Sequence, residues 1–221
     1  MLRKTYLNWA GLGICLLFTG SSLAGKELSQ PEPVLIISVY NDANVPRDTL
    51  QKAEVEAARV FHGAGIAAKW LNCEKSVAPQ ESTACREAAF PAHLHVRIAR
   101  KPLRAKEGVL GVSFLGADGA GCQADLFYER MEELEKTSHA NLASLLGHVA
   151  AHELGHLLLG TNSHAANGIM QARWTGQELA GINLSGLYFS SAESARMRER
   201  LSIGMSAEKQ SPQLAEARTG D

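Results

Sequence analysis

The sequence predicts an α+β domain, and three observations support this. A strand pattern and then a helical pattern open the region after residue 33, several further strand patterns follow, and a long apolar helix comes after them.

The 221 residues are enough for one domain with a substantial core and short tails. The formal net charge of −1 gives no electrostatic reason to expect nucleic acid as a partner.

The elements before residue 131 follow from their residue patterns. Residues 34–39 are apolar and β-branched, which predicts a strand. The next segment predicts a helix because apolar residues recur at helical spacing before two glycines: Leu50, Ala53, Ala57, Val60 and Phe61, then Gly63 and Gly65. Four more strand patterns occupy residues 67–73, 93–101, 109–115 and 124–131, with a glycine-rich stretch between the last two.

Helices dominate the second part of the sequence. A long helix is expected to begin near Ser138 or Asn141, which are both good N-caps, and to stop at Gly160. Residues 175–178 and 190–193 offer two further helix starts, and residues 190–201 predict a C-terminal helix. A run of charges at residues 132–136 is interpreted as a solvated rim.

The N-terminus predicts a secretory signal peptide at residues 1–24. Two basic residues precede a short apolar run, and small residues end at Ala24. The domain is then residues 25–203, followed by a polar flexible tail at 204–221. The mature chain is expected to be exported, secreted or periplasmic, without stable membrane insertion, and an uncleaved N-terminal anchor is the alternative.

Three cysteines remain after removal of that signal. Cys73 and Cys85 bracket a short polar segment and are expected to form one disulfide, which leaves Cys122 unpaired. Three unpaired thiols are the alternative.

The segment HELGH, residues 152–156, contains the residues that predict metal binding and proton transfer. Residues four apart lie on one face of a helix, so His152 and His156 can bind one metal ion. Glu153 projects beside that ion, where a carboxylate can take a proton from metal-activated water and deliver it to a leaving amine. This pattern predicts peptide hydrolysis without a covalent intermediate.

The longer segment HELGHLLLGTNSHAANGIM, residues 152–170, resembles the metzincin zinc proteases, most nearly their matrixin-like branch. That family carries HExxHxxGxxH and then a tight turn with a methionine beneath the metal. The resemblance implies that His152, His156 and His164 bind Zn²⁺, that Glu153 is the general base and that Met170 is the turn methionine.

The resemblance also implies a fold and a function. The metzincin-like zincin fold has a twisted, mainly parallel sheet with an antiparallel edge strand, an active-site helix below the sheet and a C-terminal helix. Residues 111–130 resemble the rim and edge strand above the cleft. The implied function is an exported zinc-dependent endopeptidase whose peptide or protein substrate lies extended along the edge strand.

The spacing departs from the family pattern. Gly160 lies four residues after His156 and His164 four after Gly160, where the family has three and three. One added helical residue advances the helix exit by ~1.5 Å and ~100°, and the extra loop residue can undo that rotation. Met170 still lies eighteen residues after His152, a spacing common in matrixins.

Two other functional classes remain open. A gluzincin-type peptidase would use a glutamate as its third ligand, and Glu178 and Glu193 are the candidates. A non-catalytic zinc-stabilised binding domain is the other, although such a site does not need Glu153. His148 lies one turn before His152 and is interpreted as a core residue or a partner of the ligands. Surface or structural roles are expected for the remaining histidines, which are His62, His93, His95 and His139.

Overall fold

The computed structural model describes residues 32–73, 84–85, 90–103 and 105–216, with side chains as far as residue 204. The predicted signal peptide lies outside the described residues. None of the described helices is long and apolar enough to span a membrane.

Five strands form one sheet in the order β2-β1-β3-β5-β4. Their bounds are β1 Val34–Asn41, β2 Ala67–Asn72, β3 His93–Ala99, β4 Gly111–Phe114 and β5 Gln123–Phe127. All pairings are parallel except that of β4 with β5, which is antiparallel. The expected mainly parallel sheet is therefore confirmed, and β4 is an antiparallel strand at its edge.

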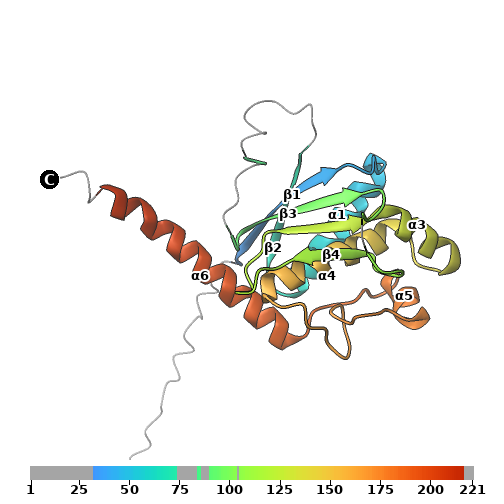
Figure 1. The fold of residues 1–221 in the computed structure, drawn as a ribbon. Coiled ribbons are helices and arrows are strands. Elements are labelled where there is room, and N and C mark those ends of the chain that lie inside the picture. The colour runs from blue at the N-terminus through green and yellow to red at the C-terminus, as the bar shows by residue number, and fades with distance from the viewer. Residues whose placement is uncertain (1–31, 74–83, 86–89, 104, 217–221) are drawn as a thin grey trace, which may run out of the picture. The chain divides into compact units, whose positions relative to one another are not determined.

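Helices α1 (Arg47–Gly63) and α4 (Leu142–Leu159) pack together beneath the sheet (Figure 1). The strands alternate, so every second residue of β1 and β3 points into this layer and is buried: Leu35, Ile37, Val39, Leu94, Val96 and Ile98. Gly147 allows the two helices to approach closely, because a Cβ there would lie 2.5 Å from the Ala53 carbonyl oxygen. The long motif helix is thus fixed against both α1 and the sheet.

A helix that the sequence analysis missed follows β5 directly. Residues 124–131 were expected to form a strand, but β5 ends at Phe127 and α3 occupies Tyr128–Thr137. The second half of that strand prediction is wrong because glutamate, methionine, leucine and lysine favour helix. Tyr128 and Met131, three residues apart, both face the core. The charge run belongs to α3, where Glu132 pairs with Arg100.

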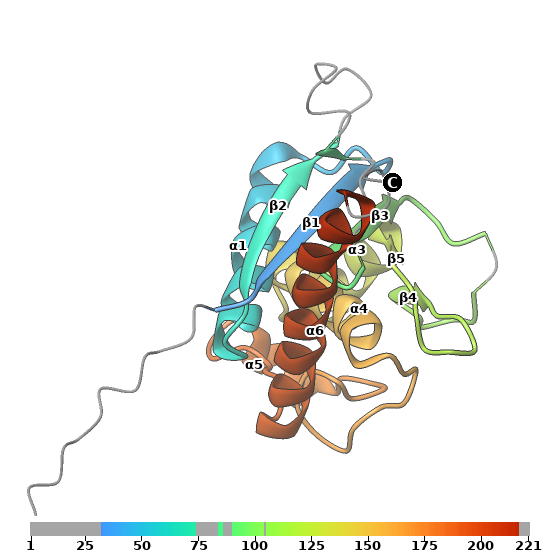
Figure 2. The same cartoon turned by 90° about the vertical axis from the view of Figure 1, so that its left-hand side faces the viewer.

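The two C-terminal helices begin at the predicted caps. Thr175 and Glu178 form a capping box before α5 (Gly176–Ile182), and Glu193 accepts hydrogen bonds from Ser190 before α6 (Ser191–Glu216). Helix α6 lies alongside the end of α4 (Figure 2), where Arg196 donates to the Leu159 carbonyl. It continues to Glu216, beyond the predicted end at 201.

The predicted disulfide is confirmed, since Cys73 and Cys85 are bonded and Cys122 is free.

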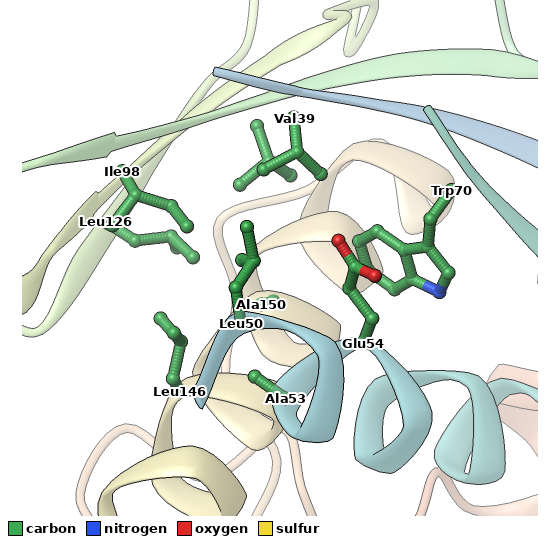
Figure 3. Close-up of a pocket in the computed structure, with 10 residues that line it drawn as sticks. Val39, Leu50, Ala53, Glu54, Trp70, Ile98, Leu126, Leu146 and Ala150 are labelled. Atoms are coloured by element: carbon green, nitrogen blue, oxygen red, sulfur yellow. The ribbon is translucent and has the colours of Figure 1, made fainter. Parts of the chain in front are cut away.

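One small cavity lies inside the core between the sheet and helices α1 and α4 (Figure 3). Its apolar lining is interrupted by Glu54, whose carboxyl lies beside the Trp70 ring. The volume is ≈ 20 Å³, room for about one water molecule, so this cavity is too small for a substrate.

Candidate metal centre and cleft

Three histidine side chains converge on one point below the edge strand. His152 and His156 come from successive turns of α4, and their Nε2 atoms lie 3.1 Å apart. His164 comes from the loop after α4, and one ring nitrogen of each of the three lies within 4.8 Å of the others. A tetrahedral zinc ion with bonds of about 2.0–2.1 Å needs its ligand nitrogens about 3.3 Å apart. The residues present therefore fit a zinc ion.

The loop between α4 and Met170 brings His164 back to the helix despite the altered spacing. Gly160 caps α4 in the left-handed conformation, with φ of 66°, and so redirects the chain sharply. The loop then closes on itself, because the Ala165 N–H donates to the Met170 carbonyl at 2.8 Å. The His164 ring consequently lies 5.4 Å from that of His152 and 4.8 Å from that of His156, measured between centroids.

Backbone carbonyls orient the two histidines of α4. His152 Nδ1 lies 2.7 Å from the Ile169 carbonyl and His156 Nδ1 lies 2.8 Å from the Thr161 carbonyl. Each Nδ1 therefore carries the proton, and each Nε2 lone pair points into the cluster. Burial lowers the pKa of His152 to about 4 and also lowers the pKa of His156. Both imidazoles are thus neutral at pH 7, the form that binds metal.

Glu153 is held under the edge strand. Its carboxyl Oε2 lies 2.6 Å from Ser113 Oγ on β4. Gly111, two residues earlier, makes the space for this carboxyl, because a Cβ there would lie 2.7 Å from Glu153 Cγ. Burial raises the pKa of Glu153 to about 7, while the Ser113 hydrogen bond opposes that rise. A carboxyl with a pKa near neutrality can both take and return a proton.

Met170 packs against the motif helix from below. It is buried, and a Cβ at Gly155, between the two helical ligands, would lie 2.9 Å from its sulfur. The neighbouring Ile169 carbonyl accepts hydrogen bonds from His152 and from Trp174 Nε1. The segment around Met170 thus packs against α4 and orients His152 through the Ile169 carbonyl.

Replacing Met170 by alanine should lower stability more than zinc occupancy. Loss of a buried methionine side chain costs about 2–5 kcal/mol in the free energy of unfolding, whereas the three imidazoles remain in place. Urea unfolding of the metal-free chain measures the first quantity, and metal analysis of the purified chain measures the second. An unchanged free energy of unfolding would show that the Met170 side chain does not stabilise the site.

Gly160→Ala should destabilise the loop that carries His164. An alanine in the left-handed conformation costs about 1–2 kcal/mol, and its Cβ would lie 3.0 Å from the Gly119 carbonyl oxygen and displace the Arg200 guanidinium. Gly176→Ala is the matched control, because nothing lies within 4 Å of a Cβ at that position. Urea unfolding of both variants tests this, and equal stability of the two would contradict the role given to Gly160.

A cleft of ≈ 750 Å³ opens above the histidines, within the range of about 300–1,000 Å³ typical of ligand sites. One wall is the edge strand from Gly111 to Ser113 and the segment before it. Beside the histidines the lining is largely apolar, with Leu134, Val149, Trp174 and Leu179. The cleft therefore combines a free strand edge with an apolar recess next to the metal-binding cluster.

The other candidate ligands do not join the cluster. Glu178 bonds to the Thr175 N–H at 2.8 Å and Glu193 to the Ser190 N–H at 2.7 Å, so both carboxylates serve as helix caps. His148 is fully buried, with Nδ1 2.8 Å from the Ser144 carbonyl and Nε2 accepting from the Leu187 N–H at 3.1 Å. It is a core residue, as expected.

The remaining histidines lie outside the cluster too. His93 bonds to Ser38 at 2.8 Å, and its ring lies 5.2 Å from that of His95. His62 and His139 are exposed.

Sequence reasoning missed the contacts that orient Glu153 and the ligands. Ser113 and Glu153 are 40 residues apart, and no local pattern links them. The carbonyls of Thr161 and Ile169 are backbone groups that every residue has, so residue type does not indicate their role. Trp174, four residues after Met170, donates to the Ile169 carbonyl and lines the cleft, and the motif itself does not specify it.

No protein-family model matches this sequence, and no curated protein matches it. Among solved structures, the chain is similar to a zinc-dependent peptidase from Methanocorpusculum labreanum at 14% identity and a TM-score of 0.50, covering 73% of this chain and 99% of that one. Archaemetzincin from Methanopyrus kandleri matches at 14% and 0.47, covering 79% and 99%. Metalloproteinase-II from Bacteroides fragilis matches at 11% and 0.47, covering 76% and 53%. The chain therefore has an α+β fold similar to that of a zinc-dependent peptidase.

Proposed function

We propose that this protein is a zinc-dependent endopeptidase. The observation that carries the proposal is the convergence of His152, His156 and His164 beside the buried carboxyl of Glu153, at the base of a cleft walled by a free strand edge. The similarity of the fold to that of a zinc-dependent peptidase agrees with this chemistry.

The cleft suits an extended peptide. Strand β4 is the last strand of the sheet, so a substrate can pair with its outer edge through backbone hydrogen bonds. The apolar recess then receives a substrate side chain next to the reacting bond. A bound zinc ion supplies polarisation of the scissile carbonyl and lowers the pKa of the attacking water.

Glu153 performs the proton transfers in this proposal. Its carboxylate accepts a proton from the attacking water and later gives that proton to the nitrogen of the leaving amine. His152 and His156 keep their protons on Nδ1 and donate them in hydrogen bonds to backbone carbonyls throughout, so they act as neutral ligands. Met170 serves as the turn methionine beneath them. The signal-peptide pattern supports export of the mature chain.

The two rival functions fit less well. A gluzincin-type site needs a free glutamate, but Glu178 and Glu193 are engaged at helix caps. A purely structural zinc site has no use for Glu153, and burying a carboxyl costs free energy.

A peptide library tests the proposal. The zinc-loaded chain should cleave a diverse set of peptides internally, as mapped by mass spectrometry, and a chelator should abolish cleavage until zinc is returned. A chain with one zinc per molecule that cleaves no member of the library would overturn the proposed function.

A further inference from the structure

We propose that Ser113 is a positioning residue that holds the Glu153 carboxyl in place under the edge strand, beside the histidine cluster. This inference rests on the proposed peptidase function and adds a residue of the edge strand to its machinery.

The geometry around Ser113 is closed and specific. Its Oγ lies 2.6 Å from Glu153 Oε2 and 2.7 Å from the Glu153 backbone carbonyl oxygen. Ser113 and Glu153 are only 8% and 7% exposed, so water does not compete freely for these contacts. The hydroxyl has one proton and therefore donates to one of the two oxygens at a time.

Ser113 occupies one oxygen of the carboxyl and leaves the other for the reaction. Its hydroxyl donates to Oε2, so Oε1 is the oxygen that accepts the proton from water in our proposal. Oε2 is then the carbonyl oxygen of the neutral acid and still accepts from Ser113. The transferred proton therefore stays on Oε1 until it passes to the leaving amine, and Ser113 keeps its own proton.

The neighbouring residues restrict the position of the Glu153 carboxyl. Gly111 lies on the same strand face as Ser113, and a Cβ there would be 2.8 Å from Glu153 Oε1. Strand β4 itself is fixed by its antiparallel pairing with β5, in which Ser113 lies opposite Ala124. The strand that pairs with substrate in our proposal thus also sets the position of the base.

The test compares variants at position 113 that differ in the hydroxyl alone. Ser113→Ala should lower kcat about 10- to 100-fold, the scale of a misplaced catalytic group, with KM and zinc affinity close to the parent values. Thr and Val have nearly the same shape, so Ser113→Thr should recover most of kcat and Ser113→Val should not. Ser202→Ala is the control, because Ser202 lies on α6 outside the cleft, where it donates to the Arg198 carbonyl at 2.9 Å, and should leave kcat unchanged.

A double variant separates the positioning of Glu153 by Ser113 from an effect of Ser113 that does not act through Glu153. In a Glu153→Gln background, Ser113→Ala should cause little further loss, because the group that it positions is gone. An equal loss in both backgrounds would overturn the inference and leave the peptidase proposal intact.

Crystal structures of the metal-free parent and Ser113→Ala chains provide a readout without activity. The Glu153 carboxyl should leave its place under β4 or occupy more than one rotamer in the variant. A carboxyl in an unchanged position would overturn the inference. A parent chain that binds zinc but cleaves nothing would instead overturn the proposed function.

Discussion

Replacing Glu153 by glutamine should leave zinc bound and lower peptide hydrolysis by at least ~100-fold, the scale of a missing proton-transfer group. The amide keeps the size of the side chain but cannot take a proton from water. The three imidazoles and the carbonyls behind them are unchanged by this substitution. Steady-state kinetics on a peptide from the library, with zinc measured on the same sample, test the prediction.

The matched control for this variant is Glu178→Gln. Glu178 caps α5 and does not belong to the histidine cluster, so its loss should leave hydrolysis at the parental rate. A Glu153→Gln chain that still cleaves peptide as fast as the parent would refute the proton-transfer role of Glu153.

Replacing His164 by alanine should release zinc. Two imidazoles from successive turns of α4 leave the ion half-coordinated. We expect the zinc dissociation constant to rise by more than ~100-fold, the upper end of the effect of losing a group that only orients a ligand. Competition with a zinc-binding dye measures this directly. Hydrolysis should fall in parallel and recover in part when free zinc is raised.

The two variants therefore fail in different ways. Glu153→Gln keeps the metal and loses the chemistry, whereas His164→Ala loses the metal and the chemistry with it. If His164→Ala binds zinc as tightly as the parent, then the longer spacing after His156 does not produce a third ligand.

The order of elements and the helical ligand pair could be predicted because both depend on local patterns. An apolar, β-branched run predicted β1, and alternation of apolar and polar residues predicted β3. Asn141 and Gly160 marked the ends of α4, where the Asn141 side chain accepts from two backbone N–H groups. The four-residue spacing of His152 and His156 follows from the helix period alone. Helix α3 was not predicted, because the strand pattern assigned to residues 124–131 extends over its first turn.

The return of His164 to the helix could not be derived from spacing. It depends on the left-handed conformation of Gly160 and on the hydrogen bond that closes the loop between Ala165 and Met170. It also depends on the close packing of Gly160 against Gly119, because a Cβ added at Gly119 would lie 2.6 Å from the Gly160 carbonyl oxygen. Each is a tertiary contact or a backbone conformation that the motif itself does not specify. Contacts of this kind also explain why Ser113 was missed.

The central claim is that three imidazoles with an extended spacing hold the ion beside Glu153. Anomalous diffraction at the zinc edge from crystals of the zinc-loaded chain tests it most directly. We predict a single strong peak at about 2.0–2.1 Å from one ring nitrogen each of His152, His156 and His164. A peak bound by His152 and His156 together with a carboxylate, with His164 turned away, would contradict the account.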